Sequence, residues 1–207
     1  MPKHRHFIDS HKCATGLAVA ALIAAYDAWD NPTAVVYLAL HGTYGLLWAL
    51  KSAFFGDRQW EREVGLGEGL TAWAALTLYW IAPWIIVADD VRVPAWHLGL
   101  AVAGWGLGVF LHFAADMQKH MHLELAPGTL LTRGLWSRCR NPNYLGELLI
   151  YVSFASLAQH WIPIAWLATF VLGYWVPNML RKDRSLARYP EFAAWRGRSW
   201  LFLPPLV

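Results

Sequence analysis

The sequence is poor in cysteine and in charged residues. Its two cysteines, Cys13 and Cys139, are far apart in the chain, so there is no CxxC metal motif, and nothing in the pattern indicates a disulfide. Charged residues make up 15% of the 207 residues, whereas hydrophobic residues make up 57%, and there are 14 tryptophans. This composition argues against a soluble domain and is typical of a membrane protein, for which we expect no nucleic-acid partner.

Long apolar segments account for the high hydrophobic content. They are centred in 14–29, 33–54, 70–88, 95–115, 144–160 and 162–179. Several approach the roughly 20 residues that a helix needs to cross a bilayer. We therefore predict an all-α fold, a polytopic integral membrane helical bundle of six to seven transmembrane helices. The last two segments are separated only by His160 and Trp161, which predicts a tight helical hairpin.

Basic residues are distributed unevenly between the expected loops. With a cytoplasmic N-terminus, every one of the 17 lysines and arginines except Arg92 falls on the cytoplasmic side. This predicts cytoplasmic N- and C-termini. The first segment lacks a small-residue cleavage site and is expected to be an anchor. The short chain has no sorting signal, which favours a bacterial inner membrane.

We expect a single membrane domain over 1–207. Its parts are a cytoplasmic tail (1–13), four helices (14–115), a cytoplasmic loop (116–142), a helical hairpin (143–179) and a basic, aromatic cytoplasmic tail (180–207) that completes a cofactor site. The first tail contains three histidines among basic residues and is interpreted as a solvated positive segment that fixes the topology. Gly42 and Gly45 are expected to allow close helix approach. The stretch GLGEG at 65–69 is interpreted as a turn, because no strand precedes it.

Three polar residues share one face at the end of the fourth apolar segment. His112, Asp116 and His120 are spaced i, i+4, i+8, a pattern that could bind a metal. Membrane di-iron enzymes need several such histidine boxes, and the other histidines here are scattered, so we predict no metal site. The face is better suited to polar contact with a cofactor, with Asp116 accepting hydrogen bonds and Lys119 contributing charge.

The richest group of polar residues is RCRNPNYLGELLIY at 138–151. Pro142 suits the first turn of a helix, so we expect Asn141 to cap a helix that begins at about Asn143. Asn143, Glu147 and Tyr151 then lie on one face. A carboxylate inside a membrane helix is costly unless it has a partner or faces water. Glu147 is therefore either a functional residue or a helix-end residue bonded to a neighbouring helix.

The run R-N-P-N-Y-L-G-E before an apolar helix resembles the signature of a membrane superfamily. It includes steroid 5α-reductases, sterol reductases, isoprenylcysteine carboxyl methyltransferases and phospholipid methyltransferases. The similarity covers about the last 100 residues and extends to the closing segment, where the matching residues are Lys182, Asp183, Tyr189, Trp195 and Pro204. Reductases resemble this chain in placing an acid after the motif glycine, as in Gly146-Glu147, which favours the steroid 5α-reductase-like branch.

The resemblance implies an NADPH-dependent reductase of a C=C bond conjugated to a ketone, acting on a steroid or similar lipophilic substrate that enters from the bilayer. Asn143 and Glu147 would hold the nicotinamide, arginines the phosphates, and Asp116 and Asp183 the ribose or backbone. The full cofactor set comprises Asp116, Lys119, Arg133, Arg138, Arg140, Asn141, Asn143, Tyr144, Glu147, Tyr151, Arg181, Asp183, Arg184, Tyr189, Arg196 and Arg198. The tail arginines could equally bind anionic membrane lipids.

The reduction also needs an acid, because charge develops on the carbonyl oxygen as the hydride adds. Tyr44 lies seven residues, roughly 10 Å, inward of Lys51 and is the candidate acid, with His41 as its expected hydrogen-bond partner. We thus predict Tyr44 and Glu147 as catalytic residues. Steroid 5α-reductases pair such a tyrosine with a glutamate on an earlier helix, and this chain has no glutamate there.

Two other functions fit the same residues. One is an S-adenosylmethionine-dependent methyltransferase of the isoprenylcysteine or phospholipid type, which would need few phosphate partners. The other is a non-catalytic lipid-binding membrane protein. The buried Glu147 argues against the latter, since an inert helix has little reason to carry that cost.

Overall fold

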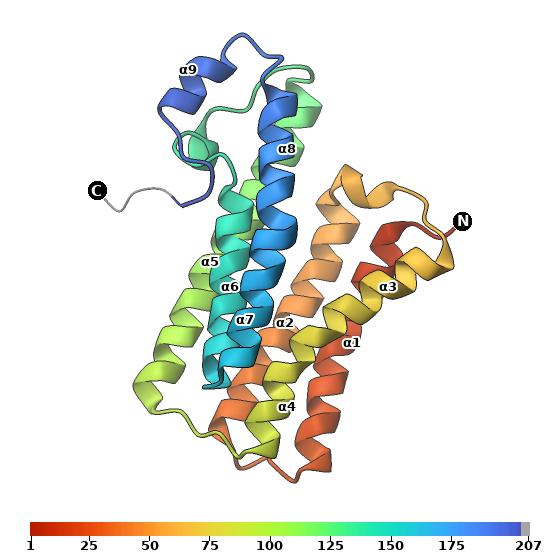
Figure 1. Cartoon of the computed structure of the whole chain (residues 1–207), viewed down its shortest axis with the longest axis vertical. Helices are drawn as coiled ribbons and strands as arrows, with labels where there is room; N and C mark the ends of the chain where they lie inside the picture. The colour runs from red at the N-terminus through yellow and green to blue at the C-terminus, as the bar shows by residue number, and fades with distance from the viewer. Residues whose placement is uncertain (204–207) are drawn as a thin grey trace. The chain divides into compact units, whose positions relative to one another are not determined.

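The computed structural model describes residues 1–203, and the secondary-structure elements in that range are all helices (Figure 1). The elements are α1 (His4–Ala25), α2 (Pro32–Phe55), η1 (Arg58–Glu61), α3 (Leu66–Thr77), η2 (Leu78–Trp80), α4 (Ile81–Ala88), α5 (Ala95–Leu125), η3 (Gly134–Trp136), α6 (Pro142–Leu157), α7 (Trp161–Phe170), η4 (Val171–Trp175), α8 (Val176–Leu186) and α9 (Phe192–Gly197). The only strand-like pairings among these residues are two isolated bridges. The all-α prediction is confirmed.

Five helical stretches are long and apolar enough to cross a membrane. They are His4–Ala25, Pro32–Phe55, Leu66–Ala88, Ala95–Leu125 and Trp161–Leu186. The third joins α3, η2 and α4, and the fifth joins α7 and α8 through the π-helical turn η4. The fifth predicted segment, 144–160, forms α6, whose 16 residues extend about 24 Å, less than the roughly 30 Å of a bilayer core. The predicted number of spans and the cytoplasmic termini stay predictions.

Helix α1 begins ten residues before the apolar segment that predicted it. The tail expected to be solvated is helical from His4, and His11 and Lys12 are buried within it. Asp9 anchors this part of the helix to α2 by accepting hydrogen bonds from Trp48 Nε1 (3.0 Å) and Ser52 Oγ (2.7 Å). The expectation of a solvated segment was wrong because polar residues of the tail find partners on neighbouring helices.

The GLGEG stretch is helical as well. Gly65 occupies the N-cap position of α3, and Gly67 and Gly69 lie within the helix. A Cβ atom at Gly69 would lie 2.3 Å from the Phe7 ring, so this glycine allows α3 to pack on α1. The interpretation as a turn was wrong, because the stretch begins a helix and Gly69 serves helix contact rather than chain reversal.

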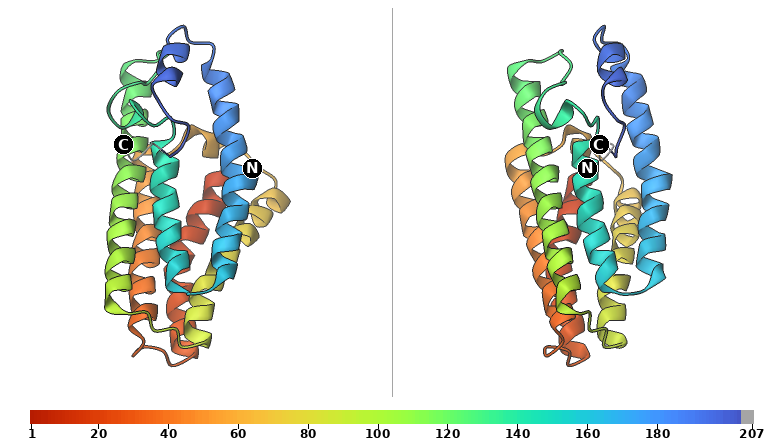
Figure 2. Two further views of the ribbon diagram at one scale, coloured as in Figure 1. Left: turned by 60° about the vertical axis from the view of Figure 1, so that its left-hand side comes forward. Right: turned by 90° about the vertical axis from the view of Figure 1, so that its left-hand side faces the viewer.

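The described residues form two compact units. Unit one comprises Met1–Trp105 and Tyr151–Trp166, and unit two comprises Gly106–Ile150 and the described residues from Leu167 onward. Within unit one, α1 and α2 lie side by side, as both views of Figure 2 show. The predicted tight hairpin between α6 and α7 is present and turns at Gln159, whose φ is 48°.

Glycines set the closest helix contacts in each unit. In unit one, a Cβ atom at Gly45 would lie 2.2 Å from the Lys12 carbonyl oxygen, and one at Gly16 would lie 3.2 Å from Gly42 Cα. In unit two, a Cβ atom at Gly146 of α6 would lie 2.4 Å from the backbone nitrogen of His112 in α5. The predicted role of Gly42 and Gly45 in close packing is confirmed. Small residues at such crossings let helix backbones approach within a membrane.

We predict that Gly45→Ala lowers the melting temperature of the detergent-purified protein. The added methyl group overlaps backbone, which cannot rotate away, and overpacking of this kind costs typically about 1–3 kcal/mol. Gly99→Ala is the matched control, since nothing lies within 4 Å of its new methyl group and alanine favours helix. Equal melting temperatures for the two variants would contradict the α1–α2 contact.

Candidate functional site

The predicted motif residues lie at the start of α6 in unit two. Pro142 is the first helical residue, and the Asn141 carbonyl accepts the first helical hydrogen bond from Leu145 N (3.1 Å). Asn141 thus occupies the predicted cap position, and the helix begins at Pro142, one residue before the expected start at Asn143. Its side chain does not cap the helix, however. Asn141 Nδ2 donates to the Leu201 carbonyl (2.7 Å), and its buried Oδ1 has no hydrogen-bond partner among residues 1–203.

Arg140 is the most highly connected of the predicted arginines. Its Nε donates to both carboxylate oxygens of Asp183, at 3.2 and 3.0 Å, and another nitrogen donates to the carbonyl and hydroxyl oxygens of Ser199. The side chains of Arg140 and Asp183 are only 7% and 13% exposed. A buried charge is stable only when it is paired and hydrogen-bonded, and this pair satisfies both conditions. Arg140 and Asp183 therefore form a buried ion pair. The sequence analysis did not predict this pairing.

The same loop binds the C-terminal segment through its backbone. Arg140 N donates to the Trp200 carbonyl (2.8 Å), and Trp200 N donates to the Arg138 carbonyl (2.9 Å), which brings the segment after α9 back to the start of α6 (Figure 2). Cys139 Sγ lies 3.1 Å from the Phe202 carbonyl, and burial raises the pKa of this thiol. Residues 138–141 and 199–202 are thus joined by both main chain and side chains. Pro204, the last predicted match, lies outside the described residues.

Two buried tryptophans connect this junction to α5 through hydrogen bonds. Trp195 Nε1 donates to the Trp136 carbonyl (2.8 Å), and Trp136 Nε1 donates to the Ala115 carbonyl of α5 (3.2 Å). Lys182 donates to the Arg140 carbonyl (2.7 Å), and its ammonium lies 4.7 Å from the centre of a Trp136 ring. The buried tryptophans therefore connect α5, the loop and the tail of unit two.

A second polar group lies between α5 and α6. His112 Nε2 is 3.9 Å from Asp116 Oδ2, and Lys119 Nζ is 3.8 Å from Asp116 Oδ1. His112 Nδ1 is 3.1 Å from the Asn143 carbonyl, which ties α5 to the motif. The buried Oδ1 of Asn143 has no hydrogen-bond partner in the described part of the chain. His112 and Asp116 are both 3% exposed, so the group is shielded from solvent.

Metal binding gains no support from this group. His120 Nε2 lies 3.2 Å from Glu124 Oε1, one turn further along α5. Among residues 1–203, no three His, Cys, Asp or Glu side chains come together as a metal site would require.

The remaining predicted cofactor residues are more accessible. Arg133, Arg138, Arg181, Arg184, Arg196 and Arg198 are exposed, and Tyr144, Glu147 and Tyr189 are half-buried. The Tyr144 ring lies 5.4 Å from that of Trp175, and Tyr189 and Arg196 line an open surface groove with Arg188 and Phe192. All predicted cofactor residues except Tyr151 thus belong to unit two.

Unit one contains the predicted acid. Tyr44 is fully buried, and the Lys12 ammonium lies 4.6 Å from the centre of its ring. Lys12 also donates a hydrogen bond to the hydroxyl of Tyr151. His41, expected to bond Tyr44, lies 3.0 Å from the Tyr37 hydroxyl and stacks on Phe154. The expected hydrogen bond between His41 and Tyr44 stays a prediction.

Lys12 is the main residue of unit one that sequence reasoning missed. It was assigned to the solvated tail because the apolar run begins after it. The signal that could have found it is helical spacing, since Ile8, Lys12, Thr15 and Val19 all face the buried side of α1.

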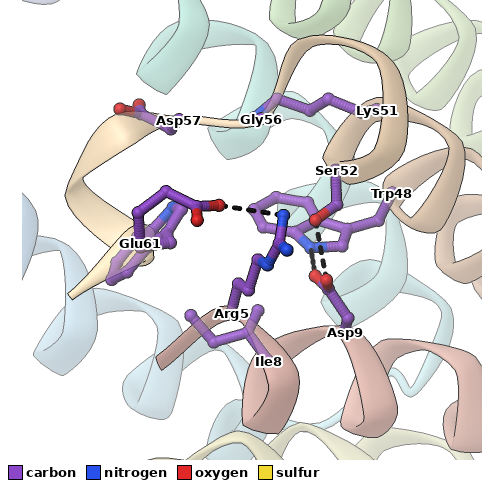
Figure 3. Close-up of a pocket in the computed structure, with 10 residues that line it drawn as sticks. Arg5, Ile8, Asp9, Trp48, Lys51, Ser52, Gly56, Asp57 and Glu61 are labelled. Atoms are coloured by element: carbon purple, nitrogen blue, oxygen red, sulfur yellow. Dashed lines mark hydrogen bonds and ion pairs between the residues drawn. The ribbon is translucent and has the colours of Figure 1, made fainter. Parts of the chain in front are cut away.

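A small cavity near the start of α1 is not large enough to bind a ligand. It is lined by Arg5, Asp9, Trp48, Ser52 and Glu61, among others (Figure 3). Its volume is about 10 Å³, which has room for about one water. The Glu61 carboxylate forms ion pairs with Lys3 Nζ (2.7 Å) and Arg5 Nη1 (2.9 Å). The hydrogen bond from Lys3 lowers the pKa of this carboxyl. The charges here tie the start of α1 to η1.

The fold and these polar groups define an α-helical membrane protein with buried polar clusters. The chain belongs to DUF1295, a family described as proteins of unknown function, whose model matches residues 70–192. This family is related to steroid 5α-reductase-like proteins. No curated protein and no solved structure matches the chain significantly.

We predict that Arg140→Gln releases the C-terminal segment. The change leaves Asp183 buried without its counter-charge, and breaking such a pair costs roughly 3–5 kcal/mol. Arg138→Gln, at an exposed neighbouring position, should change stability by less than about 0.5 kcal/mol. Both can be compared by melting temperature.

Cys139 provides a second measurement of the same release, in a Cys13→Ser background. Burial raises the pKa of the Cys139 thiol, so little reactive thiolate is present at neutral pH in the docked state. Release of the tail lowers the pKa toward its ordinary value, and iodoacetamide should then react faster in Arg140→Gln than in Arg138→Gln. Equal rates would show that Arg140 does not hold the segment.

Proposed function

We propose that this protein is a membrane-embedded NADPH-dependent reductase of a C=C bond conjugated to a ketone, in a steroid or similar lipophilic molecule. The relationship of its family to steroid 5α-reductase-like proteins supports the reaction class. The observation that carries the proposal is the buried Asn143 Oδ1, which has no partner among residues 1–203 at the position expected to hold the nicotinamide.

The residues of unit two fit this cofactor chemically. A carboxamide NH₂ is a donor, and the amide oxygen of Asn143 is a buried acceptor that a ligand would satisfy. His112 bonds the Asn143 carbonyl and so fixes the backbone at this point. The exposed arginines of the loop and tail can bind phosphates through paired N–H donors. When bound, the reduced nicotinamide supplies a hydride.

The chain's own residues then have separate tasks. Asn143 and Glu147 orient the nicotinamide end, while Asp116, with Lys119 beside it, offers acceptors for ribose hydroxyls or backbone amides. Tyr44 donates a proton to the substrate oxygen as it becomes an enol. Tyr44 is fully buried, and a proton donor that is shielded from water acts more strongly on developing charge.

One observation favours the methyltransferase alternative. Asp183 neutralises Arg140, so this most highly connected arginine of the motif does not need a phosphate to balance its charge. A cofactor without a pyrophosphate, such as S-adenosylmethionine, would fit that arrangement. The two proposals therefore differ in the cofactor that stabilises the folded protein.

We predict that NADPH raises the melting temperature of the detergent-purified protein, because a ligand that binds only the folded state stabilises it by mass action. S-adenosylmethionine should have no effect. Asn143→Ala and Glu147→Ala should abolish the shift while the proteins still insert into membranes, and Arg58→Ala, at an exposed position of η1 outside the predicted cofactor set, is the surface control. A shift with S-adenosylmethionine alone would overturn the reductase proposal in favour of the methyltransferase.

For Tyr44→Phe we predict retained NADPH binding and turnover of an enone reduced by about 10²-fold or more, the usual range for loss of a general acid. The measurement is NADPH oxidation at 340 nm with an enone steroid. Unchanged turnover would remove Tyr44 as the acid.

A further inference from the structure

Unit one contains a histidine whose side chain is buried without a hydrogen bond. His11 is 2% exposed, and neither of its ring nitrogens has a hydrogen-bond partner among residues 1–203. It belongs to α1, one of the five helical stretches long and apolar enough to cross a membrane. Most buried polar side-chain atoms in proteins are hydrogen-bonded, and an ionisable side chain in such a helix is by default a candidate for function. The contacts of His11 indicate what that function is.

Two indole rings contact the imidazole of His11. The Trp80 ring stacks on it, with the ring centres 5.1 Å apart and the planes 23° apart. The Trp73 ring stands nearly perpendicular to it, at 4.9 Å and 79°. The two indoles are 5.7 Å from each other. These three side chains, which we call the His11 cluster, join α1 to α3 and η2.

A break in the third apolar stretch accompanies this arrangement. Leu66–Ala88 is not one continuous α-helix, because the 3₁₀ turn η2 separates α3 from α4. Pro83 follows this turn and has no N–H to donate to the preceding helical turn. A 3₁₀ turn inside a helix often marks a functional position. Here its last residue, Trp80, donates from Nε1 to Thr15 Oγ1 (3.1 Å), which fixes the indole against α1.

The chemistry that the imidazole lacks is a hydrogen-bond donor. The rings around it carry no charge, which favours the neutral form with one N–H and one bare nitrogen. The face of an indole can accept an N–H in a weak contact, but it cannot donate to the bare nitrogen. The neighbouring hydroxyls of α1 are engaged elsewhere, since Ser10 Oγ donates to the Phe7 carbonyl (3.1 Å) and Thr15 Oγ1 to the His11 carbonyl (2.9 Å).

A lipid-soluble alcohol meets this need better than a trapped water does. A buried water needs two to four polar partners, whereas the rings in contact with His11 offer it apolar faces. A molecule with one hydroxyl can donate to the bare nitrogen and pack its apolar body on the indoles. Such a molecule reaches an apolar helix bundle from the bilayer.

From these contacts we propose that the His11 cluster binds the hydroxyl group of a flat, lipid-soluble molecule, such as a phenol or a ring alcohol. The hydroxyl donates to the bare nitrogen of His11, and the two indoles form the walls. Both indoles are half-buried, so the imidazole is reached from the surface past them. Trp80 is held by Thr15, and Trp73 is therefore the ring that moves to admit the ligand. This site goes beyond the proposed function, because neither the nicotinamide residues nor Tyr44 belongs to the cluster.

The test uses the full chain in lipid nanodiscs and three naphthalenes of similar shape. 2-Naphthol carries a hydroxyl, 2-methoxynaphthalene keeps the oxygen but cannot donate, and 2-methylnaphthalene has no polar atom. Isothermal titration calorimetry gives each Kd after the heat of partition into empty nanodiscs is subtracted. We expect 2-naphthol to bind the wild-type protein about fivefold more tightly than either analogue, as one net hydrogen bond implies.

His11→Leu should bind the three probes equally, because leucine is close to histidine in volume but accepts no hydrogen bond. His41→Leu is the matched control. His41 is 3% exposed and lies in the same unit, but its ring nitrogen is 3.0 Å from the Tyr37 hydroxyl and so has a partner. This variant should keep the preference for 2-naphthol. Trp73→Leu should weaken all three probes alike, because it removes a wall and leaves the imidazole.

Melting curves provide a second readout. Replacing an unsatisfied polar group by an apolar one costs little, whereas removing one partner of a buried hydrogen bond leaves the other unsatisfied. His11→Leu should therefore melt at a higher temperature than His41→Leu. If His11→Leu fails to fold, His11→Phe, which keeps a ring, takes its place in the titrations.

The outcomes are distinct. A preference for 2-naphthol that is present in the wild-type protein and in His41→Leu, and absent from the His11 variant, would support the site. Equal binding of the three probes to the wild-type protein, or binding of none, would overturn it without any variant. Persistence of the preference in the His11 variant, or its loss in His41→Leu as well, would also overturn it. NADPH is absent from these measurements, so this inference and the reductase proposal can fail separately.

Discussion

Polar groups inside this protein must be satisfied by one another, because long apolar helices leave them little access to water. Asn31 illustrates the constraint at one end of α2. Its side-chain oxygen accepts from Thr33 N (2.9 Å) and Ala34 N (3.2 Å), while its nitrogen donates to Asp90 Oδ1 (2.9 Å). One fully buried side chain thus caps a helix and binds the loop after α4. Buried polar groups that are fully paired in this way specify a single arrangement of the elements around them.

In unit two, the need to satisfy the buried Arg140 side chain fixes how the surrounding segments pack. A buried guanidinium needs a carboxylate and further acceptors, and Asp183 and Ser199 supply them from two different parts of the C-terminal region. Meeting that need brings α8 and the segment after α9 against the start of α6. The cofactor residues that we propose are carried by elements whose positions this ion pair maintains. The pair is therefore structural in the first place, and its neighbours are the candidates for ligand binding.

Buried polar atoms without a hydrogen-bond partner indicate candidate ligand-binding positions. Asn143 Oδ1 in unit two and the His11 ring nitrogens in unit one are buried and have no partners in residues 1–203. Such groups are expensive to maintain in an apolar helix bundle, and a ligand that satisfies them would recover part of that cost.

Prediction from the sequence succeeded where local rules decide. Apolar runs indicated the long helices, Pro142 the start of α6, and Gly45 the close approach of α1 and α2. It failed where partners distant in the chain decide. The start of α1 was placed too late because apolar content alone cannot show that Asp9 will be bound by Trp48 and Ser52. The GLGEG stretch was assigned to a turn because the Phe7 ring that it accommodates lies about sixty residues earlier.

By itself, then, the sequence determined the helical class, the apolar segments and the motif at the start of α6, because hydrophobic length and proline or glycine chemistry act over a few neighbouring residues. Only the tertiary structure decided that Arg140 pairs with Asp183, that Asn141 binds the tail instead of capping its helix, and that Lys12 is enclosed by aromatic rings. Those outcomes depend on which side chains meet across about 30 to 140 residues of chain. Ion pairs and hydrogen bonds between such distant residues stabilise the fold, but no local sequence pattern identifies which residues will pair.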